Sequence, residues 1–432
     1  MRLRKLAETM VTKTREKLKD ADYQKKAKVK DEYFTRNRKL GFKEYMLLLL
    51  QTSKKSLQVM LNTFCADMRS AKLEYSKQAF SKGRERIKPE AVEELFRMTV
   101  QEFYANAQYK THKGYRVCAI DGTRYNLPKT PELLAMYGSQ KSTGGMVQAL
   151  SSCLYDVMNH VLVDVSIDRF DTSEREHAAK HLQQLQKIRT DKELLLFDRG
   201  YPSEDLLYQL ENEGFKYLMR CTKKHFFREV RDFDGTDGDF LRAAAKGQHD
   251  KPLPFRIVRV RIDPTGDDSE ENVVTFITNL DRKSFPETEL LELYHMRWGI
   301  ETKYNEIKNK LYIESFSGMT PTAILQDFWA SMYMANLAAA FEYDAEREYD
   351  SRRGDKQYLH DKQINHATVI ATLRVEFLSI FLEDSKRRRA RRLHAFIRAF
   401  SKSLVDIVPL RHFPRNLLPS AKPHPVYVKS LS

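Results

Sequence analysis

The chain has 432 residues, of which 41% are hydrophobic and 11% aromatic, so it can bury a sizeable core and is not disordered as a whole. Its 74 Lys and Arg residues exceed its 59 Asp and Glu residues, which gives a formal net charge of +15 and indicates a polyanionic partner. Four scattered cysteines without a CxxC pair exclude a zinc ribbon or a disulfide framework, and no apolar run is long enough to cross a bilayer.

The excess positive charge lies at the two ends of the chain. Residues 1–40 carry a net charge of +8 and residues 386–432 carry +11, whereas residues 41–385 carry −4. One interpretation is that the ends are solvated, poorly ordered tails. The other is that they are two regions that bind the phosphate backbone of a nucleic acid.

The predicted elements follow a clear order along the chain. Residues 1–110 are mainly helical, with near-helical apolar spacing over 45–64 and a helix at 90–101 that Pro89 introduces. Strands are then expected at 116–120, 146–155, 161–167 and 194–197, and helices at 173–188, capped by Ser173, and at 203–212.

A β-rich stretch comes next. Strands are expected at 216–221, 255–262 and 272–278, separated by polar loops such as 235–239 and 266–271, and a long helical zone runs from Pro286 past residue 340. The predicted fold class is therefore α/β, with a mixed sheet, flanking helices, a β-rich insertion, and helical N- and C-terminal regions.

Two aspartates come directly after predicted strands. Asp121 follows residues 116–120 and precedes a Gly-Thr turn, and Asp198 follows the fully apolar residues 194–197. Ligands bind at the carboxyl edge of open α/β sheets, so these positions suit a site. The alternative for each aspartate is that it only caps the next turn or helix.

A third group of polar residues shares one helix face. At about 100° per residue, Tyr294, Arg297, Glu301 and Lys308 fall within an arc of about 60°, beside an apolar face. An Arg297–Glu301 surface ion pair is the alternative. Three carboxylates on separate elements suit Mg²⁺, which takes oxygen ligands, and two such ions promote in-line phosphoryl displacement. Arg and Lys on the same stripe would hold phosphates, and Tyr294 would donate a hydrogen bond to one.

The pattern of these residues resembles the signature of a known protein family. The stretch YHMRWGIETKYNEIK matches the Y-x2-R-x3-E-x6-K signature of bacterial insertion-sequence transposases of family four. Asp121 in AIDGT and Asp198 in FDRGY are similar to the first two aspartates of its DDE triad, with Glu301 as the third member. The stretch FTRNRKLGFKEYMLLLLQTSKKSLQ also resembles the family's helical leader, and the likeness runs from about residue 30 to beyond 340.

The resemblance implies a ribonuclease H-like core at 111–212 and 286–345, interrupted by a β-rich insertion at 213–285. Residues 1–110 would be a basic, helical DNA-binding region, and residues 346–432 a helical and basic region for DNA contact or dimerisation. It also implies DNA cleavage that depends on two Mg²⁺ ions, for which Mn²⁺ could substitute, with Asp121, Asp198 and Glu301 as catalytic residues and metal ligands. Strand transfer into target DNA would follow.

The implied partners are double-stranded DNA, as terminal inverted repeats and target, and a second copy of the chain in a synaptic complex. A cytoplasmic, nucleoid-associated location follows from them. Arg199 and Trp298 join the residues expected to contact DNA or phosphate, and Arg175 is a further candidate. His177 and His181 are expected on an exposed helix face. A metal-dependent nuclease on the same core and an inactive DNA-binding relic remain the alternatives.

Overall fold

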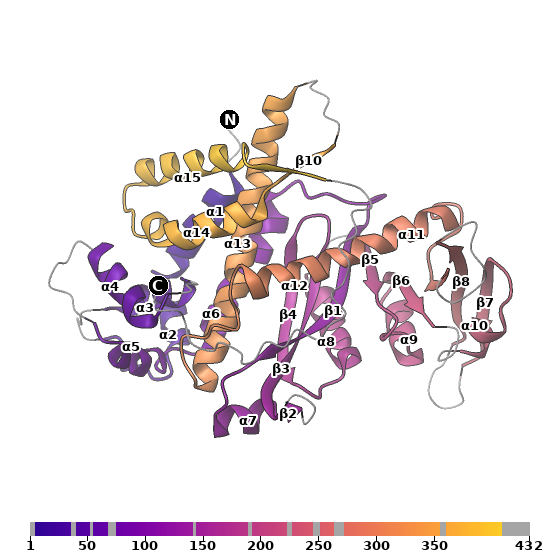
Figure 1. Ribbon diagram of the computed structural model, residues 1–432, viewed down its shortest axis with the longest axis horizontal. Coiled ribbons are helices and arrows are strands. Elements are labelled where there is room, and N and C mark those ends of the chain that lie inside the picture. Colours follow the sequence, from indigo (N-terminus) through magenta and orange to yellow (C-terminus); the bar gives the residue numbers. More distant parts are fainter. Residues whose placement is uncertain are drawn as a thin grey trace. The chain divides into compact units, whose positions relative to one another are not determined.

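The computed structural model (Figure 1) describes residues 5–35, 40–51, 55–67, 75–140, 144–188, 192–222, 227–244, 251–262, 272–354 and 360–407. The predicted polar loop at 266–271 and the basic residues after 407 lie outside this description. The chain divides into two compact units. The sheet unit contains Tyr109–Arg124 and Leu150–Tyr304, and the helical unit contains Met1–Gln108, Tyr125–Ala149 and Asn305–Ser432.

A mixed sheet is the centre of the sheet unit. Its strand order is β3-β1-β5-β6-β9-β8-β7, with β4 paired to β3. Strands β1, β5 and β6 pair in parallel, whereas β6, β9, β8 and β7 pair antiparallel. The strand bounds are β1 Arg116–Asn126, β3 Met146–Asp156, β4 Val161–Arg169, β5 Glu193–Phe197, β6 Lys216–Cys221, β7 Asp237–Arg242, β8 Leu253–Arg261 and β9 Val273–Thr278.

The parallel strands are buried on both faces, which explains their apolar sequences. All five residues of β5 are buried between β1 and β6. The one charged member, Glu193, is paired in register with Arg116 of β1, whose guanidinium binds its carboxylate at 2.8 and 2.6 Å. A buried charge needs a partner of this kind, so the ion pair fixes one end of the β1–β5 pair.

Helices surround this sheet. Helix α8 packs against β4, α9 against β6 and β8, and α11 against β8. The bounds are α8 Glu174–Lys187, α9 Glu204–Asn212, α10 Arg228–Asp232 and α11 Glu287–His295, followed by a 3₁₀ turn at Met296–Trp298 and by α12 Gly299–Asn309.

The helical unit is built around one long helix, α13 (Pro321–Arg353). Its central part is buried on all sides, because it packs against α1, α3, α6, α14 and α15. The other elements are α1 Leu6–Lys17, α2 Ala21–Ala27, α3 Phe42–Leu50, α4 Leu57–Asp67, α5 Lys77–Arg84, α6 Pro89–Asn106, α7 Pro131–Tyr137, α14 His366–Phe381, α15 Lys386–Phe400, and the short strands β2 Ser139–Gln140, β10 Lys362–Ile364 and β11 Leu404–Asp406. Together with the sheet unit, these helical terminal regions confirm the predicted fold class.

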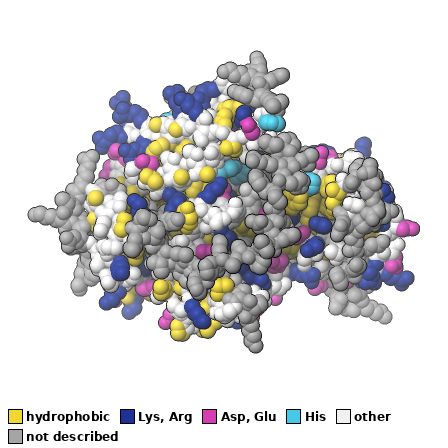
Figure 2. Space-filling model, viewed as in Figure 1, with side chains coloured by type: hydrophobic (Ala, Val, Ile, Leu, Met, Phe, Trp, Pro, Cys, Tyr) yellow, Lys and Arg dark blue, Asp and Glu magenta, His cyan; other side chains and the backbone are white. Residues whose placement is uncertain are grey.

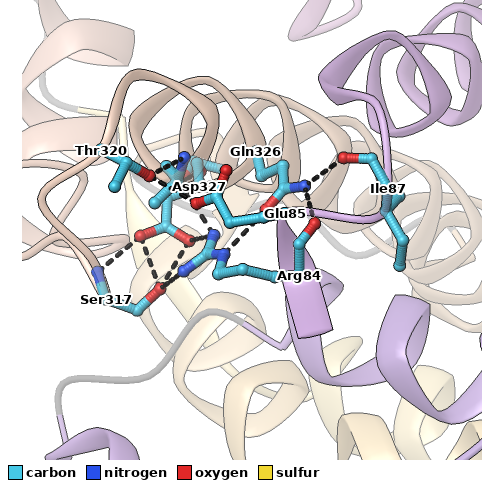
Figure 3. Close-up of polar contacts among 9 residues, drawn as sticks. Arg84, Glu85, Ile87, Ser317, Thr320, Gln326 and Asp327 are labelled. Atoms are coloured by element: carbon cyan, nitrogen blue, oxygen red, sulfur yellow. Dashed lines mark hydrogen bonds and ion pairs between the residues drawn. The ribbon is translucent and has the colours of Figure 1, made fainter. Parts of the chain in front are cut away.

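A buried guanidinium connects α5 to α13 (Figure 3). Arg84 donates from Nε to Gln326 at 2.7 Å and from Nη2 to the Asp327 carboxylate at 2.8 Å. Its Nη1 donates to the Ser317 hydroxyl at 2.6 Å. Gln326 in turn donates to the backbone carbonyls of Arg84 and Ile87. Arg84 is only 1% exposed, so this network holds the end of α5 against the start of α13.

Several predicted element boundaries were wrong. The apolar spacing over 45–64 belongs to two helices, α3 and α4, because Gln51 is extended and ends α3; residues Tyr45–Leu50 of α3 are all buried. The helical zone after Pro286 is interrupted before Thr320, which caps a new helix with Pro321 in its first turn. The predicted polar loop at 235–239 instead enters β7 at Asp237, whose carboxylate is bound by Arg256.

The cysteines and the apolar helices can be compared with what the composition predicts. All four cysteines are within the described residues, are buried and form no disulfide, as expected: Cys65, Cys118, Cys153 and Cys221. None of the helices in the described ranges combines the length and the apolar character that crossing a membrane requires.

Candidate active site

Asp121 lies within strand β1, not at its end. The strand runs on to Asn126, although the parallel pairing with β5 stops at Ile120 opposite Phe197. Gly122 was predicted to form a turn, but it lies within β1. The nearby Glu174 side chain explains why this position has no side chain of its own. A Cβ atom on Gly122 would lie 3.0 Å from Oε1 of Glu174. The glycine therefore leaves room for a carboxylate from helix α8.

Asp198 occupies the predicted position directly after β5. Its Oδ1 accepts a hydrogen bond of 3.0 Å from the Tyr294 hydroxyl on α11. The parallel pairing of β1 with β5 therefore brings Asp121 and Asp198 to the same edge of the sheet.

The Arg297 guanidinium contacts the carboxylates of both Asp121 and Glu301. It lies in the 3₁₀ turn between α11 and α12, and its side chain is 4% exposed. Its Nη2 is 2.9 Å from Oε1 of Glu301, and its Nη1 is 3.6 Å from Oδ2 of Asp121. The Arg297–Glu301 ion pair therefore exists; its guanidinium is buried, whereas the Glu301 side chain is 44% exposed.

The charges at this site are crowded. The pKa of Asp121 is raised to about 6, with burial as the largest cause; the negative charges of Glu174 and Asp198 contribute to the rise, and the Gly122 N–H and Arg297 oppose it. Burial also raises the pKa of Tyr294, and the Asp198 charge adds to that rise. For Arg297, burial alone would lower the pKa, but Tyr294 and the surrounding carboxylates raise it.

The other predicted contact residues have different surroundings. Lys308 lies on α12 but belongs to the helical unit, where its Nζ is 5.4 Å from the ring centroid of Tyr125. Trp298 is 43% exposed and stacks on His295 with a centroid distance of 4.9 Å. Arg199 is exposed in the turn after Asp198.

The guanidinium of Arg175 donates to the Gly200 carbonyl at 3.2 and 3.3 Å and not to Asp121, Asp198 or Glu301 in the described structure, and its contact with DNA stays a prediction. The expectation that His177 and His181 lie on an exposed face of α8 was wrong. His177 and His181 are fully buried, because they share the face of α8 that carries Ala178, Leu182 and Leu185, and α8 packs against β4. His177 binds the Ser166 hydroxyl at 2.6 Å, and His181 binds Asp164 at 2.7 Å.

Comparisons with known proteins assign this arrangement to a family. The family model described as "Transposase DDE domain" matches residues 112–337, which is more than half of the chain. The chain belongs to this family. It is 26% identical over 267 residues to the transposase InsG for insertion sequence element IS4 of Escherichia coli K12, covering 60% of this chain and 59% of that protein. It thus spans less than two thirds of that relative.

A solved structure is also similar to the chain. It is the cryo-EM structure of a piggyBac transposase synaptic complex with hairpin DNA, with a TM-score of 0.43 and 13% sequence identity. The match covers 84% of this chain and 75% of the piggyBac chain.

The transposase domain contains one carboxylate that the sequence analysis missed. Glu174, in the first turn of α8, approaches the residues next to both aspartates, since a Cβ atom on Gly200 would lie 3.8 Å from its Oε2. Ser173 caps α8, as expected, by accepting a hydrogen bond from the Arg175 N–H. The sequence does place two acidic residues, Glu174 and Glu176, in the first turn of the helix after β4. Only the folded structure shows that Glu174 is the one that approaches the aspartates.

The donor chemistry fits a hard divalent cation. Carboxylate oxygens are the ligands that Mg²⁺ prefers, and Asp121 is a largely buried carboxylate near the negative charges of Glu174 and Asp198. Within the described ranges, no three His, Cys, Asp or Glu side chains are close enough to hold a metal ion as they stand. The Arg297 guanidinium is the cation that contacts both Asp121 and Glu301 in this structure.

Proposed function

We propose that the chain is a transposase that cleaves DNA at the ends of an insertion sequence and joins the freed 3′ ends to target DNA. The observation that carries this proposal is the meeting of Asp121 and Glu301 on the Arg297 guanidinium, with Asp198 at the same sheet edge. Membership of the DDE domain family supports it, because residues 112–337 include all three carboxylates.

Asp121, Asp198 and Glu301 would hold Mg²⁺, as two ions, with Mn²⁺ as a substitute. When bound, the metal activates the attacking oxygen and stabilises the leaving oxygen of the phosphodiester. Glu174 is placed to add a further negative charge beside the aspartates.

The remaining side chains of the site would bind and orient the substrate. Nε of Arg297 is buried without a hydrogen-bond partner, so this guanidinium retains a donor for a phosphate oxygen. Tyr294 orients Asp198 through its hydroxyl. Lys308, Arg199 and Trp298 complete the proposed set of DNA contacts, the first two as cations and Trp298 as an exposed aromatic ring.

Helix α15 is the proposed contact with the duplex outside the site. Its exposed cations include Lys386, Arg387 and Arg391, and Figure 2 shows Lys and Arg side chains gathered where α15 lies in Figure 1. Such contacts position a duplex without reading its sequence. The proposed partners are terminal inverted repeats, target DNA and a second copy of the chain in a synaptic complex. Association with the bacterial nucleoid in the cytoplasm would follow from DNA binding.

Cleavage and joining can be tested together. The purified chain is incubated with a linear duplex carrying the element's own ends, a target plasmid, and Mg²⁺ or Mn²⁺, and the products are separated on a denaturing gel. We expect cleavage and joining by the wild type. Asp121→Asn, Asp198→Asn and Glu301→Gln should each lower cleavage at least about 1,000-fold while end binding persists.

Glu292→Gln is the matched control, since Glu292 is exposed on α11, nine residues before Glu301 and so on the opposite side of a helix. It should cleave like the wild type. Full metal-dependent cleavage by any of the three site variants would contradict the assignment. Nicking without joining would instead support the metal-dependent nuclease.

A further inference from the structure

A chain of buried polar side chains lies behind Asp121. Ser152 on β3, His181 on α8 and Asp164 on β4 are 0%, 0% and 5% exposed. His181 contacts Asp164 through Nδ1 at 2.7 Å and the Ser152 hydroxyl through Nε2 at 3.0 Å. The Ser152 hydroxyl then donates to the backbone carbonyl of Asp121 at 3.1 Å.

Side chains bind the Asp121 carbonyl just beyond the end of the parallel pairing between β1 and β5. The parallel register of β1 with β5 ends at Ile120, one residue before Asp121. The Asp121 carbonyl accepts hydrogen bonds from Ser152 and from the Tyr304 hydroxyl of α12. Tyr304 is itself fixed, because its hydroxyl accepts the backbone N–H of Cys153 at 3.1 Å.

The single hydroxyl proton of Ser152 orders the contacts of this chain. Ser152 donates that proton to the Asp121 carbonyl. The contact between His181 and Ser152 then requires Nε2 to be the donor, and Asp164 holds the imidazole from its other side, at Nδ1.

The relay is enclosed by the packing of α8 against β4. Asp164 is the carboxylate in contact with the imidazole, and burial lowers the pKa of His177, one turn earlier on α8, to about 4. Other charged or titratable groups near the pair are Lys180 and Asp168 on the outer side of α8 and β4, and Cys153 on β3.

We infer that Asp164, His181 and Ser152 form a positioning relay that holds the backbone of Asp121 in place for catalysis. The inference rests on the proposed function. The Asp121 side chain itself contacts the Gly122 N–H at 2.9 Å and Arg297, so its position depends on where the backbone lies. A misplacement of about 1 Å in a catalytic group can lower a rate by about 100-fold.

Ser152→Ala removes the hydroxyl, and Ser151→Ala is its matched control. Ser151 is the next residue on β3, is equally buried, and has an Oγ without a hydrogen-bond partner in the described structure. The full-length variants are bound to a duplex carrying the element's ends, and cleavage is started with Mg²⁺ under single-turnover conditions. We expect Ser152→Ala to cleave 10- to 100-fold more slowly with unchanged end binding, and Ser151→Ala to match the wild type. Ser152→Thr, which keeps the hydroxyl, should recover most of the rate.

Equal cleavage rates for Ser152→Ala and Ser151→Ala would overturn the relay. A second measurement separates this result from a failure of the proposed function. In ¹⁵N-labelled protein without DNA, NMR should show the backbone amide resonances of Asp121 and Gly122 shifted by Ser152→Ala and by His181→Asn but not by Ser151→Ala. Unshifted resonances in Ser152→Ala would overturn the relay whether or not the chain cleaves DNA. If the shifts are found but no cleavage occurs with Mg²⁺ or Mn²⁺, the hydrogen bonds of the relay to the Asp121 backbone stand and the transposase proposal fails.

Discussion

Individual carboxylates in this chain have pKa values set by burial. Asp121 and Asp344 both have a pKa raised to about 6, with desolvation as the largest cause. Asp344 accepts the backbone N–H groups of Leu6 and Ala7 at 3.0 and 2.9 Å, where α1 begins. These hydrogen bonds favour the charged form but do not outweigh the burial of the carboxylate.

Asp344 should make the stability of the chain depend on pH. Its folded-state pKa is about 6 and its unfolded value is 3.8, so its contribution is fully present below pH 3.8 and is lost as pH rises through about 6. Relative to Asp344→Asn, the wild type should gain about 1 kcal/mol of unfolding free energy between pH 7 and pH 5. Urea unfolding of both proteins at the two pH values measures this difference. Parallel pH dependence of the two proteins would show that Asp344 is not the titrating group.

Contacts between elements depend on single buried groups as well. Arg84 joins α5 to α13 through four partners, and Asp327 is its counter-ion at 2.8 Å (Figure 3). Removing one partner of a buried pair leaves the other charge uncompensated, which costs more than the pair contributes.

Arg84→Met should therefore lower the unfolding free energy by about 3 kcal/mol, measured by urea unfolding with circular dichroism. Lys82→Met, an exposed change on the same helix, is the control and should have little effect. The double variant Arg84→Met/Asp327→Leu should recover part of the loss, because it removes the remaining charge. A double variant less stable than Arg84→Met would contradict this explanation.

The sequence predicts elements best where one local pattern determines them. The apolar residues of β5 followed by Asp198 identify a buried parallel strand and its carboxyl end, and the structure agrees. Helical spacing placed Arg297 beside Glu301, and the pair is 2.9 Å apart. His181 was misplaced although Ala178, Leu182 and Leu185 mark the buried face that it shares, because histidine was taken as a surface residue. Glu174 was missed because its approach to Gly122 depends on how α8 packs in the sheet unit, which the sequence does not show.

Positive and negative side chains lie in different parts of the molecule. Helix α15 begins with Lys386 and exposes Arg387 and Arg391, whereas the carboxylates of Asp121, Asp198 and Glu174 are near one another at the proposed metal site. If these three cations contact phosphates, replacing them with Gln should weaken end binding and reduce the slope of log K against log[salt] by about 0.9 per lost contact.

Fluorescence anisotropy over a salt series measures this slope. The charge-retaining variant Lys386→Arg/Arg387→Lys/Arg391→Lys is the control and should keep the wild-type slope, since a phosphate contact through charge alone accepts either cation. An unchanged slope in the Gln variant would show that α15 does not contact the duplex.

The burial of all four native cysteines has a practical consequence for such experiments. Burial raises the pKa of Cys153 and of Cys221 to about 12, so both thiols stay protonated and unreactive in the folded chain. A single cysteine introduced on the surface could then carry a fluorophore or a DNA crosslinker without removal of the natural ones. Slow modification of Cys118 and Cys153, which lie on β1 and β3, would report transient opening of the strands that carry Asp121 and Ser152.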